Sequence, residues 1–446
     1  MDKNHLQDLL KKVQGLGAAA ADVLMVNSAQ MNVRERMGKP ETLERAEAVG
    51  LGLRVLVRGR GGMRQALVSS NDVRPDTLSA LAERAVDMAK VAPVDPYACL
   101  APRGKLAKES KLLELSDPNT PSLEQLIDMA RLAEDTALKV KGVTNSEGAD
   151  AFFSRNHIEL LTTDDFAGEY ENTSFSLSVS VIAGKGDAME TDYDYAVARH
   201  LEDLKDPVKL GKNAARRAVG KLKPRKVATC QVPVVFDARV ARSLVSAFAG
   251  AINGASVARG ATFLSGQMGK QIFAPGIEII DDPLRLRGPS SRPFDGEGVS
   301  GKKLRVVKDG VLSSWLLDTR SAKQLKLRTT GHAVRGVGSP PSPGNSNFYM
   351  KKGKLKVKDL IADIKSGFYV TEAFGMGING ITGDYSQGAA GFWIENGKLT
   401  YAVSEVTIAG HLLEMFKALT PASDLEFLYG TNCPSLRIEG MTIAGK

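Results

Sequence analysis

The chain has few cysteines, few aromatic residues and no long apolar run. Its three cysteines are scattered over 446 residues, so we expect neither a disulfide framework nor a cysteine-rich zinc knuckle. No run of 18 apolar residues occurs, which argues against a membrane-spanning helix. The N-terminal segment is amphipathic and lacks the apolar centre of a signal peptide. These features predict a cytoplasmic protein.

Histidine is also scarce, and its spacing disfavours a local metal site. No two histidines lie within one helical turn of each other, and the whole set is His5, His157, His200, His332 and His411. A catalytic zinc needs three protein ligands, usually with two close together on one element. His411 and Glu414 have i, i+3 spacing, but such a pair is more typical of an ordinary amphipathic helix. Glu190, Asp192 and Asp194 could share a strand face and bind a hard cation, although a solvated strand face is the favoured interpretation.

Motifs for nucleophilic catalysis and for phosphate binding are missing as well. The sequence contains neither a G-x-S-x-G elbow nor a G-x-x-x-x-G-K-[ST] loop. Ser300 and Lys303 fit S-x-x-K, but the companion motifs of serine acyltransferases are absent. Cys230 and Cys433 have no local basic partner that would activate the thiol. These residues alone therefore identify no active site.

The composition is typical of a folded protein with a net positive charge. Hydrophobic residues make up 43% and charged residues 25%, which is typical of globular domains, and the net charge is +8. Lysines and arginines are scattered, and the densest group is "RVLVRGRGGMR" (54–64). We interpret it as a β-hairpin with a glycine tip. No aromatic residues alternate with its arginines to stack on bases, which argues against nucleic-acid binding.

The length predicts two or three domains, and we place them at 1–115, 116–222 and 223–446. The first part combines an amphipathic N-terminal helix with strands at 21–38 and 41–59. A second helix at 74–92 should bury a stripe consisting of Leu78, Leu81, Ala85 and Met88. The second part opens with a capping box, Ser122 and Gln125, before a helix, and continues in strands. The expected fold class is α+β, with mixed α/β structure in the N-terminal part.

The third part is predicted to be β-rich, barrel-like or sandwich-like, with a few helices. Asp309-Gly310 and Asn396-Gly397 each separate two alternating segments, which is a strong hairpin signal. Helices are predicted at 238–256 and 408–419. The first has almost no charged or bulky residues over 244–260, yet it carries an apolar stripe that we expect to be buried, made of Val240, Leu244, Phe248, Ala251 and Ile252.

Several long stretches resemble the TldD/PmbA family, also called TldD/TldE. The resemblance extends over nearly the whole chain and is carried best by "RGATFLSGQMGKQI" (259–272), "FDGEGVSGKKLRVVKDGVL" (294–312), "TEAFGMGINGITGDYSQGAAGFWIENGKLTYAVSEVTIAG" (371–410) and "PSLRIEGMTIAG" (434–445). The family comprises two related subunit types. One type carries a zinc-protease motif, H-E-x-x-x-H, just before the R-G-x-x-x-x-S-G-Q segment, and adds a cysteine ligand from a loop near its C-terminus.

The zinc motif is degenerate in this chain. When the resemblance is followed back from Arg259, the motif positions for the two histidines hold Val245 and Gly250, and the glutamate position holds Ser246. Valine and glycine supply no metal ligand, and a serine without a base cannot deprotonate zinc-bound water. Cys433 does not stand where the cysteine ligand is expected. The resemblance therefore implies the subunit type without a zinc site, with no cofactor and no catalytic residue of its own.

The resemblance further implies a heterodimer with a TldD-type zinc-protease subunit. Family members are linked to maturation of peptide antibiotics and to degradation of a small antitoxin, and an older label is "modulator of DNA gyrase". Extended or unfolded peptides are thus the expected substrates, bound by strand addition at a sheet edge. A homodimer could form when the partner is absent. Two alternatives remain open: an independent peptidase with an unrecognised site, and a binding protein for nucleic acid or gyrase.

Overall fold

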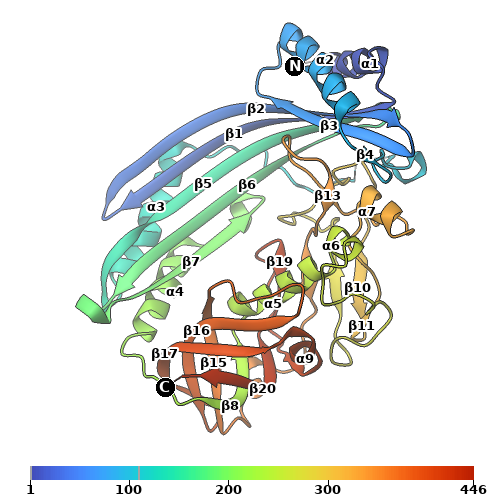
Figure 1. Ribbon diagram of the computed structural model, residues 1–446. Coiled ribbons are helices and arrows are strands. Elements are labelled where there is room, and N and C mark those ends of the chain that lie inside the picture. The colour runs from blue at the N-terminus through green and yellow to red at the C-terminus, as the bar shows by residue number, and fades with distance from the viewer. Residues whose placement is uncertain (1–2, 109–110, 446) are drawn as a thin grey trace.

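The computed structural model describes residues 3–108 and 111–445, and a long curved antiparallel sheet dominates its first half (Figure 1). This sheet runs without interruption through the first two parts that the sequence predicts, whose division remains a prediction. In spatial order its strands are β4 (Val94–Asp95), β3 (Gly62–Ser70), β2 (Lys39–Gly59), β1 (Ala20–Arg36), β5 (Val143–Thr162), β6 (Ala167–Ala183) and β7 (Glu190–Ala198).

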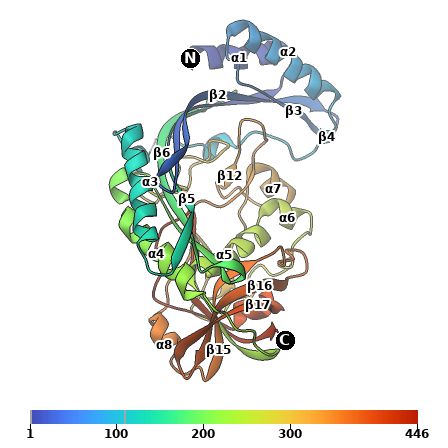
Figure 2. The ribbon, with the colours of Figure 1, turned by 90° about the vertical axis from the view of Figure 1, so that its left-hand side faces the viewer.

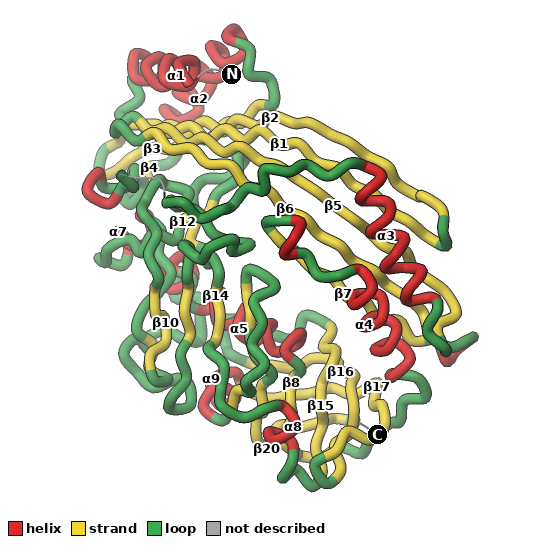
Figure 3. Tube along the Cα trace, turned by 180° about the vertical axis from the view of Figure 1, so that it is seen from behind, coloured by secondary structure: helices red, strands yellow, loops and turns green. Residues whose placement is uncertain are grey.

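Four helices cover one face of this sheet in two pairs, and the other face is turned toward the C-terminal part (Figure 2). The first pair packs on β1, β2 and β3, and the second on β5, β6 and β7 (Figure 3). The pairs are α1 (Lys3–Gly15) with α2 (Pro75–Val91), and α3 (Leu123–Leu138) with α4 (Pro207–Gly220). Short 3-10 turns lie at η1 (Arg103–Lys105), η2 (Gly186–Ala188) and η3 (Leu201–Asp203).

The helix faces follow the apolar periodicity of the sequence, with one exception. The predicted stripe of α2 is buried at Leu78, Leu81 and Ala85, but Met88 is 42% exposed. The buried face of α2 instead continues through Val86 and Ala89. Met88 was therefore assigned to the wrong side of the helix, because several small residues satisfy an i, i+3, i+4 pattern equally well.

The start of α3 confirms the predicted capping box. The Ser122 side chain accepts a hydrogen bond from the Gln125 backbone N–H, and the Gln125 side chain accepts one from the Ser122 N–H. Two donors that a helix N-terminus would otherwise leave unpaired are thereby satisfied.

Replacing Ser122 with alanine is expected to lower the free energy of unfolding by about 1 kcal/mol, because the Gln125 N–H loses its acceptor. Ser265→Ala is a matched control, since Ser265 is exposed and its hydroxyl has no partner among the described residues. Denaturant titration of both variants measures the difference. Equal stability of the two variants would show that the cap contributes nothing.

A second sheet in the C-terminal part closes on itself, which confirms the barrel-like interpretation. Its strand order is β17 (Lys398–His411), β16 (Asp384–Glu395), β15 (Ser366–Phe374), β8 (Cys230–Phe236), β20 (Leu436–Ala444) and β18 (Leu419–Pro421). An additional pairing of β17 with β20 closes the ring. A five-stranded sheet lies beside it: β11 (Val311–Leu312), β10 (Leu304–Lys308), β9 (Ile279–Asp281), β14 (Phe348–Met350) and β19 (Thr431–Asn432), and a two-stranded ribbon pairs β12 (Ala333–Val334) with β13 (Ser342–Pro343).

Among the described residues, five further helices belong to this part: α5 (Ala238–Ala251), α6 (Gly254–Ala258), α7 (Thr319–Gln324), α8 (Val357–Ile361) and α9 (Leu412–Lys417). The helix predicted at 408–419 was wrong in extent. Residues up to His411 form the end of β17, where Ile408 pairs with both Gln387 and Ile443. Strand pairing on two sides outweighs the helical periodicity, so α9 begins only at Leu412.

Both predicted hairpin turns are confirmed. Asp309 and Gly310 have φ of 50° and 75° between β10 and β11, and Asn396 and Gly397 have φ of 49° and 75° between β16 and β17. Two successive positive φ angles are the signature of the tight turn that matches the twist of a hairpin.

The described residues include no helix long and apolar enough to cross a membrane.

The large sheet is joined to the C-terminal part by a buried ion-pair network and an aromatic cluster. Asp22 on β1 lies between Arg54 on β2 and Arg335, and all three side chains are at most 5% exposed. Phe294 packs edge-on against Phe166 and Tyr170 near the turn between β5 and β6. These contacts hold the curved sheet over the C-terminal part, so that the two enclose the region around α5.

Candidate functional site

Helix α5 lies between the large sheet and the barrel (Figure 1). It follows β8 directly, and the side chain of Asp237 caps it by accepting a hydrogen bond from the Arg239 N–H. The predicted apolar stripe is confirmed, since all five of its residues are at most 7% exposed. Phe248 at its centre contacts the rings of Phe273 and Phe416. One side of α5 thus packs in the core, and the residues on its other side can contribute to a binding site.

The three positions of the degenerate zinc motif do not share one face of α5. Val245 is 2% exposed and belongs to the core, whereas Ser246 and Gly250 are exposed. Positions five residues apart on a regular α-helix differ by about 140° around the axis, which accounts for the opposite environments of 245 and 250. A side chain at Gly250 would meet open space. Two of the three motif positions, Ser246 and Gly250, therefore lie on the exposed side of α5.

Two cavities adjoin the first turns of α5 and share the side chains of Arg239 and Arg242. One has a volume of about 210 Å³ and reaches toward Asp194, Tyr429 and Cys433. The other has a volume of about 400 Å³ and is lined by Tyr193, Arg239, Arg242, Ser243, Thr371, Glu372, Phe374 and others. The two arginines thus form a positively charged wall between the sheet and the barrel.

Tyrosine rings hold Arg242 in place. Its guanidinium lies 4.4 Å from the ring centre of Tyr429 and 5.5 Å from that of Tyr195, and it also donates a hydrogen bond to the Tyr195 hydroxyl. Cation–π contacts of this kind orient a charged group without neutralising it. Arg242 is half-buried and forms no ion pair with a carboxylate in the part of the chain that the structure describes. Its charge is therefore available to an anionic or carbonyl group of a ligand.

The carboxylates of β7 are paired rather than solvated, so the solvated interpretation was wrong for two of the three. Asp192 is 2% exposed and pairs with Arg239 at 3.1 Å and Lys221 at 3.4 Å. Asp194 is 4% exposed and pairs with Lys205 and Arg217. Only Glu190 is half-exposed. A cation site for these side chains is disfavoured, because basic residues that are distant in sequence already compensate the two buried charges.

The surroundings of β7 shift the pKa values of Asp194 and Glu190 in opposite directions. Burial by itself would raise the pKa of Asp194, but hydrogen bonds from Asn213 and Lys205 and the charge of Arg217 outweigh it and hold the pKa below its usual value. Burial raises the pKa of Glu190. Asp194 therefore stays ionised at neutral pH and keeps its basic partners in position.

The outer edge of β7 faces α5, and side chains cover its backbone carbonyls. The Tyr193 carbonyl accepts hydrogen bonds from Arg239 and Arg217, and the Tyr195 carbonyl accepts one from the Tyr429 hydroxyl. Lys221 donates to the Thr191 carbonyl. An edge covered in this way is protected against pairing with another strand. Strand addition of a peptide at β7 would require these bonds to break.

The other predicted positions lie apart from this region. His411 precedes α9 and its Nε2 lies 3.0 Å from the Thr382 carbonyl oxygen, while Glu414 is exposed, so the two do not form a ligand pair. Ser300 is exposed in a loop. Cys433 is 4% exposed, and burial raises the pKa of its thiol well above the usual value. A thiol in this state is a poor nucleophile and a poor metal ligand.

Sequence profiles of one family cover most of the chain. The PmbA/TldA metallopeptidase domain 1 matches residues 21–89, the central domain matches 116–222 and the C-terminal domain matches 229–445. The metalloprotease PmbA of Escherichia coli O157:H7 is 37% identical over 429 residues, which is 96% of this chain and 92% of that protein. The chain belongs to the PmbA/TldD family of metalloproteases.

Relatives named TldD and TldE also match this chain. A TldD homologue from Haemophilus influenzae is 26% identical and aligns with 80% of this chain and 76% of its own length. The crystal structure of a Bacteroides thetaiotaomicron protein, described as a modulator of DNA gyrase, superposes on this chain with a TM-score of 0.91 at 27% identity. The superposition covers 100% of this chain and 99% of that protein's chain. TldE from Thermococcus kodakarensis has the same fold, with a TM-score of 0.83 at 18% identity over 99% of this chain and 100% of its own.

Proposed function

We propose that this chain is the subunit without the hydrolytic zinc site in a two-subunit metalloprotease of the PmbA/TldD family. The proposal rests on the residues found at the zinc-motif positions. Val245 packs in the core, and Ser246 and Gly250 present no metal ligand to solvent. A hydrolytic zinc site needs imidazole, thiolate or carboxylate ligands and a base for the bound water. We assign both to a TldD-type partner, and the complex to the cytoplasm.

The substrates in this proposal are extended peptides, such as peptide-antibiotic precursors or a small antitoxin. Because the edge of β7 is covered, we revise the mode of binding. Side chains of the α5 region, rather than strand addition, would contact the peptide. Arg242 offers a charge held by tyrosine rings, and the two adjoining cavities of about 210 Å³ and 400 Å³ offer room for peptide side chains.

Co-purification with a relative that carries H-E-x-x-x-H tests the proposal. We expect a stable 1:1 complex on size exclusion and cleavage of an unstructured peptide by the complex. The lone chain should leave that peptide intact, with or without added zinc. Chelator-sensitive cleavage by the lone chain, or failure of the two chains to associate, would contradict the proposal.

Replacing Arg242 with alanine should weaken peptide binding in the complex. We expect KM to rise about tenfold while kcat changes little, since a charge-assisted hydrogen bond contributes about 1.5–3 kcal/mol and the arginine does not touch the proposed zinc site. Arg84→Ala is the control, because Arg84 is an exposed arginine on α2. An unchanged KM for Arg242→Ala would remove this residue from the peptide path.

Nucleic-acid binding has little support from the basic segment 54–64. Arg54 is 4% exposed and pairs with Asp22, and Arg64 donates a hydrogen bond to the Ala92 carbonyl. Only Arg58 and Arg60 of this segment are exposed arginines. Two charges at one hairpin tip provide few phosphate contacts. We therefore propose peptides, not nucleic acid, as the ligands.

A further inference from the structure

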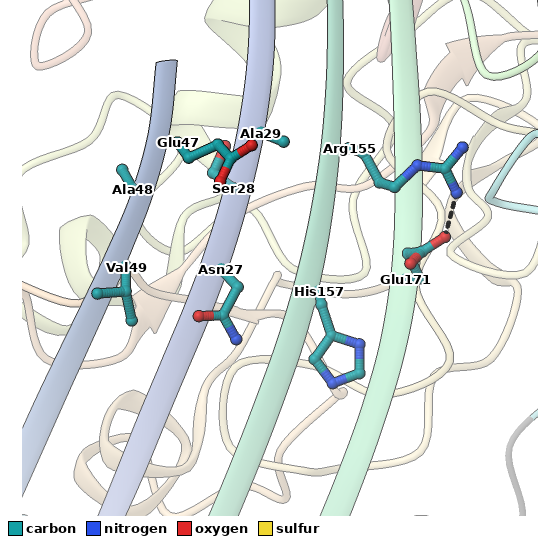
Figure 4. A pocket seen from close by; sticks show the side chains of 9 residues that line it. All are labelled: Asn27, Ser28, Ala29, Glu47, Ala48, Val49, Arg155, His157 and Glu171. Carbon is teal, nitrogen blue, oxygen red and sulfur yellow. Dashed lines mark hydrogen bonds and ion pairs between the residues drawn. The ribbon is translucent and has the colours of Figure 1, made fainter. Parts of the chain in front are cut away.

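A second candidate site lies on the opposite, helix-bearing face of the large sheet. Figure 3 shows the strands uncovered between the two helix pairs. Side chains of these strands line a cavity of about 450 Å³ there. Asn27, Arg155, His157 and Glu171 project from neighbouring strands into this region, and Arg155 is paired with Glu171 (Figure 4). This face is remote from α5, and nothing in the proposed protease function uses it.

Strand register brings one histidine and two further carboxylates together beside this cavity. His157 and Glu159 alternate along β5 and therefore point to the same face, and Glu169 on β6 is directly opposite Glu159. The Nε2 atom of His157 lies 3.4 Å from Glu159 Oε1 and 3.7 Å from Glu169 Oε2. Ligand atoms from all three residues lie within 4.8 Å of one another.

Glu159 is the member of this group that most needs a cation. Its side chain is only 8% exposed, and its neighbours on this face, Met25 and Leu161, belong to the core under α1 and α2. No donor among the described residues hydrogen-bonds its carboxylate, and the one basic side chain within 4.0 Å of it there is that of His157, at 3.4 Å. A buried carboxylate with so little compensation is costly unless a positive charge lies beside it.

The nearby arginine does not supply this charge. Arg155 is bonded to Glu171 at 2.7 Å and to the backbone carbonyls of Asp117 and Asn119. The Ser116 hydroxyl also donates to Glu171. Hydrogen bonds from Arg155 and Ser116 therefore already compensate Glu171. Within 3–108 and 111–445, Glu159 and Glu169 have one basic neighbour, and they share it: the imidazole of His157.

We propose that His157, Glu159 and Glu169 bind a divalent first-row metal ion, with Zn²⁺ as the simplest candidate. Ligand atoms about 2.0–2.2 Å from a tetrahedral zinc lie roughly 3.4 Å apart, which is close to the two distances from the imidazole. Imidazole nitrogen combined with carboxylate oxygen suits zinc and its neighbours better than calcium or magnesium. Asn27, directly opposite His157 on β1, is placed to complete the site, or water can do so. The ion would cross-link β5 and β6.

Zinc titration of the chelator-treated full chain tests this site independently of protease activity. We expect one equivalent of Zn²⁺ to bind by isothermal titration calorimetry and to raise the thermal midpoint. Glu159→Gln and Glu169→Gln should each weaken binding at least about tenfold, because each removes a ligand. Glu44→Gln, an exposed carboxylate on β2 of the same sheet, should bind as the unaltered chain does.

Three outcomes would overturn the proposal. The unaltered chain could bind no zinc. All variants could bind equally, which would place the metal elsewhere. The thermal midpoint of Glu169→Gln could be lower than that of the unaltered chain while added zinc changes the midpoint of neither. That result would show a structural role for Glu169 and no metal binding. Because Glu169 is 53% exposed, its variant is expected to fold even where Glu159→Gln does not.

Discussion

Replacing Asp22 with asparagine is expected to destabilise the chain by about 3–5 kcal/mol, since the change leaves two buried guanidinium groups without their counter-charge. Asp22 Oδ2 accepts a hydrogen bond of 2.8 Å from Arg54 Nε, and Oδ1 accepts one from Arg335. Burial by itself would raise the pKa of Asp22, but the two arginines outweigh it and lower the pKa. This stabilisation is present above the ordinary aspartate pKa and is lost as the pH falls below it.

The matched control is Asp8→Asn on α1. Asp8 pairs with Lys11 at 3.2 Å, but both side chains are about 70% exposed, so its loss should change stability by less than about 0.5 kcal/mol. Guanidinium titration followed by circular dichroism compares the two variants. Similar shifts for both would show that the buried network does not hold the sheet to the C-terminal part.

The second large effect is a dependence of stability on pH that originates in Glu297. Burial, reinforced by the charge of Asp295, raises the pKa of Glu297 from 4.5 to about 8. The folded chain therefore binds a proton that the unfolded chain has released between these values, so stability falls as the pH rises from about 4.5 to 8. Glu297→Gln removes this loss and keeps an oxygen that can accept the two hydrogen bonds from Thr319.

At pH 8 the Glu297→Gln variant is expected to be more stable than the unaltered chain by on the order of 2 kcal/mol, with the difference shrinking toward pH 5. Denaturant titrations at pH 5, 6, 7 and 8 measure this trend. Glu44→Gln, whose carboxylate is exposed, should run parallel to the unaltered chain. A difference between Glu297→Gln and the unaltered chain that does not vary with pH would contradict the assignment.

The sequence predicted best those features that depend on neighbours in the chain. The capping box at Ser122, the glycine turns after Asp309 and Asn396, and the buried stripe of α5 all depend on short-range patterns, and the structure confirms them. The closed sheet of the C-terminal part also agrees with the predicted alternation.

Features that depend on residues distant in the chain could not be predicted. Asp22 and Arg335 are 313 residues apart in sequence, and Asp192 meets Arg239 only because β7 lies against α5. The same limit hid the group of His157 and Glu169, because only the register of β5 and β6 brings them together. Helix periodicity at 408–419 was misleading for a related reason, since pairing with strands distant in sequence makes residues 408–411 the end of β17.

The central claim is that this chain contributes structure, and not the metal, to peptide hydrolysis. The most direct measurement is the rate of peptide cleavage by the reconstituted complex when motif positions are altered in one subunit at a time. Ser246→Ala in this chain should leave kcat within about twofold, whereas loss of a motif histidine in the partner should abolish cleavage, because water activation then fails. A loss of kcat of about 100-fold or more for Ser246→Ala, with the complex intact, would contradict the claim.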